Sequence, residues 1–217
     1  MHETPFITIE GPIGVGKTSL ARAISKHYKF HLLKEIVDEN PFLGKFYENI
    51  EEWSFQTEMF FLCNRYKQLE DIHHNFLQIN KPVVADYHIY KNLIFARRTL
   101  KKEQYDKYLK IYEILTGDHP KPTLIIYINA GLDTLLKRIK TRGRVIEKNI
   151  DPNYLRQLSS DYEKAMIQWE KENPHIPVIR INGNEIDFVH NSQDLENVLD
   201  TIGHYFQKGV HLDEFKK

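Results

Sequence analysis

A glycine-rich segment near the start of the chain has the residue types and spacing of a phosphate-binding loop. Residues 11–18 read GPIGVGKT, which matches the pattern GxxxxGK[ST]. Glycines let the backbone turn its N–H groups toward an anion, and a helix that begins here adds partial positive charge. Lys17 is expected to contact the β- and γ-phosphates of a nucleoside triphosphate, and the Thr18 hydroxyl to bind Mg²⁺, which prefers oxygen ligands. The expected triphosphate site consists of Gly11, Pro12, Ile13, Gly14, Val15, Gly16, Lys17, Thr18 and Ser19.

Asp86 is a second candidate, at the end of the apolar run 82–86 (PVVAD). Sheets of parallel strands present ligand-binding groups at their carboxyl edge. Asp86 is therefore expected to be the second protein partner of Mg²⁺ and to border the substrate site. An aspartate at a strand end can also be an ordinary turn cap, and the sequence alone leaves that alternative open.

The elements that must position these residues alternate between apolar runs and amphipathic segments. Strands are predicted at 6–10, 31–37, 82–86, 123–129 and 176–181, and helices at 19–28, 53–77, 89–98, 102–115, 132–140, 152–171 and 192–206. This alternation predicts an α/β fold, a five-stranded parallel, doubly wound sheet with helices on both faces. The charged segment 141–150 is expected to form a mobile lid. No linker or internal repeat divides the sequence, so a single domain spanning 1–217 is expected.

The composition limits the classes of partner. Thirty basic and thirty acidic residues cancel, so no net charge would gather nucleic acid or an anionic membrane. No apolar stretch approaches the roughly 20 residues of a membrane span, and the first residues do not resemble a signal peptide. The one cysteine, Cys63, cannot form an internal disulfide, and beside Phe61 and Leu62 it is expected to be a buried thiol. A cytoplasmic protein without nucleic-acid or membrane partners is expected.

Taken together, these motifs resemble those of the deoxyribonucleoside kinase family, and in detail the bacterial deoxyguanosine and deoxyadenosine kinases of Gram-positive type. The resemblance spans nearly the whole chain. It is carried by the loop 11–18, by Glu35, by the segment 47–65 (YENIEEWSFQTEMFFLCNR), by Asp86 and by the arginine-rich run 138–147 (RIKTRGRVIE). It implies a P-loop kinase fold with an arginine-rich lid. It also implies phosphorylation of the 5′-hydroxyl of a deoxynucleoside, with ATP and Mg²⁺, by a homodimer that serves nucleotide salvage.

The resemblance implies roles for particular residues as well. Glu35 corresponds to the carboxylate that takes the proton from the attacking 5′-hydroxyl, which requires hydrogen-bond reach. Tyr47 and Glu147 correspond to residues that hold the 3′-hydroxyl of the sugar. In the family, the P-loop lysine brings positive charge to the transition state. Three lid arginines add fixed positive charge when the lid closes. They correspond to Arg138, Arg142 and Arg144.

Glu58 and Arg65 are the expected readers of the base. They lie seven residues apart on the helix predicted at 53–77, hence two turns apart on one face. A carboxylate offers two acceptors to the N1–H and 2-amino groups of guanine, and arginine can donate to O6 and N7. Most of the family has glutamine where Glu58 stands, and a glutamine amide can also satisfy adenine. Deoxyguanosine is therefore the predicted acceptor, while a deoxyadenosine kinase or a broad deoxynucleoside kinase remains the alternative.

The chain departs from the family pattern next to Asp86. Relatives usually have arginine and then serine at the two following positions, where this chain has Tyr87 and His88. That arginine normally adds charge near the transferred phosphate, so either a lid arginine replaces it or the site is arranged differently. Asn92 stands where many relatives have an acidic residue that helps hold the base, and it is a candidate base contact. No catalytic role is expected for His88.

Two other classes of P-loop protein are alternatives to a nucleoside kinase. A nucleoside monophosphate kinase would need a cluster of cations for the phosphate of its acceptor, and Glu58 provides none. A regulatory nucleotide-binding protein of the switch type would hydrolyse its triphosphate slowly, and the chain lacks the Asn-Lys-x-Asp motif by which GTPases read guanine. Stimulation of triphosphate turnover by a nucleoside would distinguish a kinase from a switch.

Overall fold

A five-stranded parallel sheet forms the centre of the molecule. The structure is a computed structural model that describes residues 4–37, 39–148 and 150–209. The strands are β1 (Phe6–Glu10), β2 (His31–Leu33), β3 (Val83–Ala85), β4 (Leu124–Asn129) and β5 (Val178–Asn182), in the order β2-β3-β1-β4-β5. All four pairings are parallel. Every residue of β1 and β3 is buried, as is usual for a parallel sheet covered on both faces.

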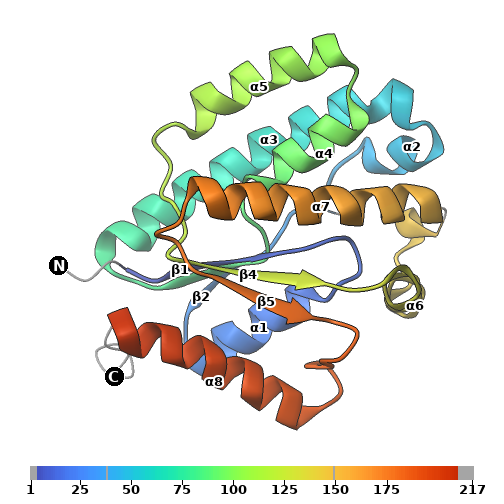
Figure 1. Ribbon diagram of the computed structural model, residues 1–217. Helices are drawn as coiled ribbons and strands as arrows, with labels where there is room; N and C mark the ends of the chain where they lie inside the picture. The colour runs from blue at the N-terminus through green and yellow to red at the C-terminus, as the bar shows by residue number, and fades with distance from the viewer. Residues whose placement is uncertain (1–3, 38, 149, 210–217) are drawn as a thin grey trace.

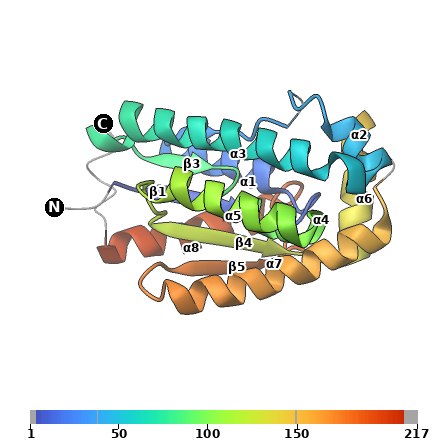
Figure 2. The same ribbon diagram turned by 90° about the horizontal axis from the view of Figure 1, so that it is seen from above.

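Helices cover both faces of this sheet (Figure 1). On one face lie α1 (Lys17–Tyr28) and α8 (Ser192–Gly209). On the other lie α3 (Ile50–Asn75), α4 (Lys91–Thr99) and α7 (Pro152–Glu172), with α5 (Lys102–Thr116) packed against α3 and α4. Seen from above, α3 and α7 flank this layer (Figure 2). The remaining elements are α2 (Leu43–Glu48), η1 (Leu77–Ile79), α6 (Leu132–Arg142) and η2 (Val145–Glu147). The predicted fold class is confirmed.

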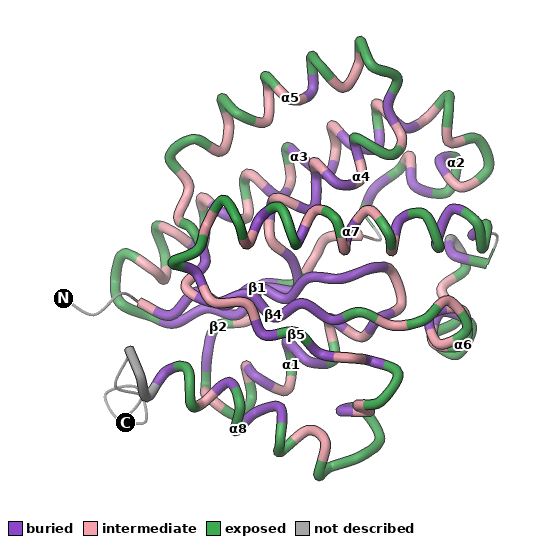
Figure 3. Tube along the Cα trace, viewed as in Figure 1, coloured by how far each residue is buried: buried purple, intermediate pink, exposed green. Residues whose placement is uncertain are grey.

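The apolar core lies on both sides of the sheet, and the central strands are buried along nearly their whole length (Figure 3). A group of buried polar residues interrupts it on the inner face of α3. Ser54, Thr57, Glu58 and Arg65 are buried there together with Phe61. Buried polar groups are costly unless they are paired, so this stretch of α3 indicates a functional surface inside the molecule.

The predicted strands and helices all occur, but the second strand is shorter than predicted. It ends at Leu33, because its register pairs Leu33 with Ala85, the last residue of β3. Residues 34–37 therefore leave the sheet. The structure also contains α2, which was not predicted because six residues with two buried side chains, Leu43 and Phe46, show too little periodicity.

Cys63 is exposed, so the prediction of a buried thiol was wrong. Successive residues of a helix are about 100° apart, and the buried side of α3 runs through Leu62 and Arg65. Cys63 comes directly after Leu62, so its side chain lies about 100° further around the helix, on the exposed face. Among the described residues, no helix combines the length and the apolar character needed to cross a lipid bilayer.

Candidate active site

A cavity of about 980 Å³ opens where the strands end. Because all strands are parallel, the loops after β1, β2 and β3 meet at this edge, and they contribute the phosphate-binding loop, Glu35 and Asp86 to its wall. Helix α3 contributes Glu58 and Arg65. The volume is at the upper end of the range for small-molecule sites, about 300–1,000 Å³.

The loop after β1 has the backbone of a phosphate cradle. Gly11 has a φ of 146°, and a Cβ atom on it would lie 2.2 Å from the carbonyl oxygen of Ile128 in β4, so only glycine fits. Gly16, with a φ of 107°, precedes the first turn of α1. The loop therefore leads directly into a helix N-terminus, where N–H groups can bind an anion. The loop residues that line the cavity are Ile13, Gly14, Gly16, Lys17, Thr18 and Ser19.

Lys17 lies over this loop. Its ammonium group donates hydrogen bonds to the carbonyl oxygens of Gly11 (2.7 Å) and Pro12 (3.0 Å). Burial, and then the neighbouring charge of Lys91, lower the pKa of Lys17 to about 8. Lys17 is thus a buried cation held by neutral carbonyl groups, a position suited to a phosphate.

Thr18 and Asp86 form a pair that could hold a metal ion. The Thr18 hydroxyl donates to Oδ2 of Asp86. Oδ1 of Asp86 is buried and has no hydrogen-bond partner among the described residues. Burial raises the pKa of Asp86, although Lys17 opposes this. A hydroxyl group next to a carboxylate with an unshared oxygen fits a hard cation such as Mg²⁺.

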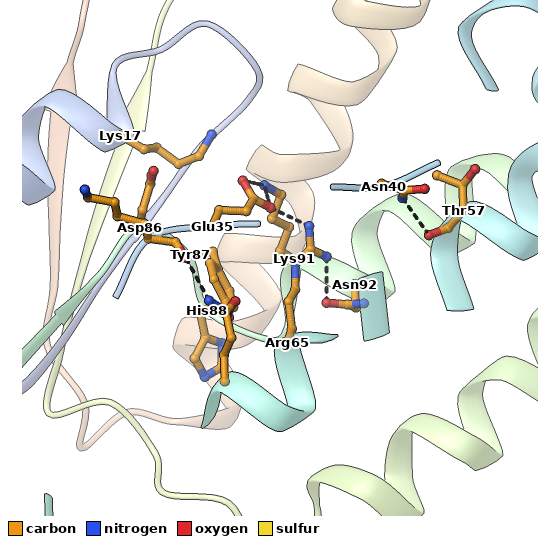
Figure 4. Close-up of polar contacts among 12 residues, drawn as sticks. Lys17, Glu35, Asn40, Thr57, Arg65, Asp86, Tyr87, His88, Lys91 and Asn92 are labelled. Carbon is orange, nitrogen blue, oxygen red and sulfur yellow. Dashed lines mark hydrogen bonds and ion pairs between the residues drawn. The ribbon is translucent and has the colours of Figure 1, made fainter. Parts of the chain in front are cut away.

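Glu35 is the centre of an ion-pair cluster (Figure 4). Its Oε1 accepts a hydrogen bond from Nη2 of Arg65 (2.5 Å), and both of its carboxylate oxygens accept from the Lys91 ammonium group (2.6 and 2.8 Å). Burial alone would raise the pKa of Glu35, but Lys91, Arg65 and Lys17 lower it to about 2. Glu35 is therefore ionised, and it faces the cavity on the side of the phosphate-binding loop.

Lys91 is a site residue that the sequence reasoning missed. It begins α4, is buried, and lines the cavity. Tyr87, at the position where relatives usually have arginine, instead points into the core beneath α3, where its hydroxyl donates to Oε1 of Gln68 (2.8 Å). A lysine at the start of a helical stretch is usually solvated. No motif or helical spacing marks it in the sequence, because residue 87 lies outside α4.

Within the described residues, the ring of His88 forms a hydrogen bond only with the backbone N–H of Tyr90 (3.3 Å). The backbone N–H of His88 donates to Glu10 (2.5 Å), and burial lowers the pKa of its ring to about 4. The ring is thus neutral at pH 7. That His88 has no catalytic role stays a prediction.

Glu58 and Arg65 point into the same part of the cavity from α3. Glu58 is only 2% exposed; Oε1 receives one long hydrogen bond, from Thr99 (3.4 Å), and Oε2 has no partner within the described part of the chain. Burial raises the pKa of Glu58 to about 7, although Arg65 opposes it. The Arg65 guanidinium stacks on the ring of Phe61, 4.5 Å from its centroid. A planar ligand with two donors would satisfy Glu58.

Asn92 lies behind Arg65 and is not among the described residues that line the cavity. Its Oδ1 accepts from Nη1 of Arg65 (2.7 Å), and its amide nitrogen donates to the hydroxyl of Tyr108 (2.8 Å). Asn92 therefore fixes the orientation of Arg65. Asn92, a predicted base contact, thus contacts Arg65 and is not among the described residues of the cavity wall.

Tyr47, from α2, and Glu147, from η2, line the cavity together. Burial and the neighbouring Glu147 carboxylate raise the pKa of Tyr47, so its hydroxyl stays protonated and can donate. Glu147 is buried and pairs with Arg142 and with Arg144, the latter at 3.5 Å. The predicted sugar-binding pair and two of the predicted lid arginines thus lie side by side.

Arg138 also lines the cavity, but it is anchored to the loops beneath it. Its guanidinium donates to the carbonyl oxygens of Val15 (3.0 Å) and Gly183 (2.9 Å). It connects α6 to the phosphate-binding loop and to the turn after β5. Arg138 and Arg142 therefore belong to α6, and only Arg144 of the three lies beyond this helix.

Comparisons with known proteins agree with this geometry. A family model described as deoxynucleoside kinase matches residues 7–207. Deoxyguanosine kinase of Bacillus subtilis (strain 168) is 57% identical over 198 residues, 91% of this chain and 96% of that protein. Deoxyadenosine/deoxycytidine kinase of the same organism is 30% identical over 209 residues, 93% and 94% of the two chains. The structure of deoxyadenosine kinase from M. mycoides with bound dATP has the same fold, with a TM-score of 0.79 and 24% identity over 92% of this chain and 99% of that one. The chain belongs to the deoxynucleoside kinase family.

Proposed function

We propose that the protein phosphorylates the 5′-hydroxyl of deoxyguanosine with ATP as the donor. The observation that carries the choice of base is the buried Glu58 carboxylate, whose Oε2 has no partner among the described residues. Two adjacent acceptors match the N1–H and 2-amino donors of guanine, whereas adenine would place the lone pair of its N1 against them. The relative with 57% identity is a deoxyguanosine kinase, which supports the same choice.

Arg65 completes the recognition of guanine. Its guanidinium is held by Asn92 and by the face of Phe61, and it donates to O6 and N7 of the base. Adenine carries an amino donor in place of O6, which would face the arginine donors. Glu58 and Arg65 therefore favour the same purine for independent reasons. Deoxyadenosine kinase is the second candidate, because relatives of that name are about as similar as more distant deoxyguanosine kinases, at 34% and 30–31% identity.

The reaction uses the groups around Glu35. Tyr47 and Glu147 bind the 3′-hydroxyl and so direct the 5′-hydroxyl toward Glu35, which accepts its proton. The backbone of the phosphate-binding loop and Lys17 hold the donor phosphates, and Arg138, Arg142 and Arg144 contribute positive charge around the transferred group. Thr18 and Asp86 would hold Mg²⁺, whose charge would offset that of the donor phosphates.

A panel of nucleosides tests this proposal. The protein is incubated with ATP, Mg²⁺ and each of deoxyguanosine, deoxyadenosine, deoxycytidine, thymidine and guanosine, and the monophosphates are separated by chromatography. Deoxyguanosine is expected to give the highest kcat/KM. A higher value for deoxyadenosine would reject the assignment of the base. Turnover of ATP that no nucleoside stimulates would instead support the alternative of a regulatory nucleotide-binding protein.

Two further predictions accompany the proposal. Homodimerisation follows from the family resemblance, and sedimentation would measure it. A cytoplasmic location follows from the single cysteine and the intracellular supply of ATP. Neither is needed for the chemistry proposed above.

A further inference from the structure

Lys91 is a buried cation to which the reaction described above gives no task. Its ammonium group contacts both carboxylate oxygens of Glu35 and lies 5.5 Å from the centre of the Phe95 ring. Only 7% of its side chain is exposed. Burying a lysine is costly, and Glu35 already has Arg65 as a partner. Glu35 thus has two cationic partners, and its single charge does not balance both of them.

Lys91 lines the same cavity as the lysine of the phosphate-binding loop. The ammonium groups of Lys91 and Lys17 repel each other. The carboxylates of Asp86, Glu35 and Glu10 offset part of this repulsion, and a phosphoryl group between the two ammonium groups would offset more of it. Glu35, which lies against Lys91, is the proposed acceptor of the 5′-hydroxyl proton, so the attacking oxygen must come within hydrogen-bond distance of the same carboxylate.

We propose that Lys91 is a further catalytic residue, whose ammonium group contacts the phosphoryl group during its transfer and stabilises the charge that develops there. The inference rests on the proposed function of Glu35 as the base. It also accounts for the departure next to Asp86, because Tyr87 is buried in the core and brings no charge to the cavity. The cation comes from the first turn of α4 instead.

The movement of charge during the reaction favours this role. As O5′ forms its bond to the γ-phosphorus, its proton passes to a carboxylate oxygen of Glu35, and the bond from phosphorus to the β,γ-bridging oxygen breaks to release ADP. Glu35 thereby becomes neutral. Lys91 loses the charge it was paired with at the moment when negative charge is spread over the transferred phosphoryl oxygens. Its attraction therefore increases toward the transition state, which lowers the barrier instead of merely tightening binding.

The test compares Lys91→Gln, Lys91→Met and Lys91→Arg with wild type, using the nucleoside that wild type phosphorylates best. Loss of the charge is expected to lower kcat by about 100-fold or more, the usual effect of removing one group that stabilises a transition-state charge. The KM for the nucleoside is expected to stay within about threefold, since Glu58, Arg65 and Tyr47 bind it. Lys91→Arg is expected to keep at least about ten times the kcat of Lys91→Gln. Lys67→Met, on an exposed lysine of α3 that pairs with Asp71, is the matched control.

A double-mutant cycle separates a catalytic cation from one that only positions Glu35. In a Glu35→Gln background, Lys91→Gln is expected to lower the residual rate by at least about a further tenfold, measured with radiolabelled ATP. No further loss would mean that Lys91 acts only through Glu35, and the proposal would be wrong. A change in KM with unchanged kcat, or an arginine variant no better than glutamine, would also overturn it. Unfolding temperatures of all variants show whether the fold is intact, and failure of wild type to phosphorylate any nucleoside would reject the proposed function instead.

Discussion

Replacing Glu58 with glutamine is expected to shift the preference of the enzyme from deoxyguanosine toward deoxyadenosine. In the structure Oε2 has no partner among the described residues and Oε1 receives only the long bond from Thr99, so both oxygens are available to the base. A glutamine would present one acceptor and one donor. Guanine would lose one hydrogen bond and meet donor against donor, whereas adenine would find a match for both its N1 and its amino group.

The size of the effect follows from the burial of the site. Glu58 and Arg65 are 2% and 4% exposed, so water cannot replace a lost partner. Leaving a buried polar group unpaired costs about 1–3 kcal/mol. If deoxyguanosine loses about 1 kcal/mol and deoxyadenosine gains as much, the ratio of their kcat/KM values changes by about 30-fold, since 1.4 kcal/mol corresponds to a factor of ten.

The assay measures kcat/KM for both deoxynucleosides at saturating ATP. It is run at pH 8, where Glu58 is ionised. Glu51→Gln is the matched control, because Glu51 lies on the same helix and pairs with Lys101 at the surface. The control is expected to leave the ratio unchanged. A ratio in Glu58→Gln within about threefold of wild type would refute the account of base recognition, whatever the total activity.

Three other predictions follow from the geometry. Burial raises the pKa of Glu58 to about 7, and guanine needs the ionised form, so the KM for deoxyguanosine is expected to rise as the pH falls through 7. At pH 6, where about a tenth of the carboxyls are ionised, the KM should be about tenfold higher than at a pH well above 7. Glu58→Gln should abolish this dependence in initial-rate measurements. Gly11→Ala places a Cβ atom 2.2 Å from the carbonyl oxygen of Ile128 and is expected to lower the free energy of unfolding by more than about 2 kcal/mol. The control is Gly44→Ala, in α2 with open space around it, which should leave that free energy unchanged or raise it by about 0.5–1 kcal/mol. Urea unfolding measures both. Tyr47→Phe removes a donor for the 3′-hydroxyl and should raise the KM for deoxyguanosine by about tenfold but leave that for 2′,3′-dideoxyguanosine unchanged; an equal rise for both nucleosides would contradict the role of Tyr47.

The fold could be predicted because its signals are local. Strands such as Leu124–Asn129 are nearly continuous apolar runs, and the loop 11–18 specifies both its own backbone and the helix that follows. The end of β2 could not be predicted from such local signals. Leu33 is its last residue because β3 offers no partner beyond Ala85, and the length of a neighbouring strand is a property of the sheet rather than of residues 31–37.

The candidate site was predictable where function depends on a short motif or on helical spacing. Glu58 and Arg65 lie on one face of α3 because they are seven residues apart, and the structure places both in the cavity. Lys91 belongs to no short motif and to no such pair of residues on a helix. Its importance arises only when α4 and the segment after β2 meet, which brings residues 56 positions apart into contact. The prediction that Cys63 is buried was wrong for a related reason. Residues adjacent in sequence do not face the same side of a helix, so apolar neighbours do not imply burial.

The ion pairs of Glu35 also affect whether water can act as the phosphoryl acceptor in place of the nucleoside. A kinase that holds ATP beside an empty acceptor pocket could pass the phosphoryl group to solvent. Paired with Lys91 and Arg65, Glu35 has a pKa of about 2 even though burial alone would raise it, so a water molecule there meets a poor base. In the proposed complex, donation from Arg65 to the base would weaken its ion pair with Glu35, and the pKa of Glu35 would then rise. With Glu35 as the proposed base, hydrolysis of ATP in the absence of a nucleoside is therefore expected to be slow.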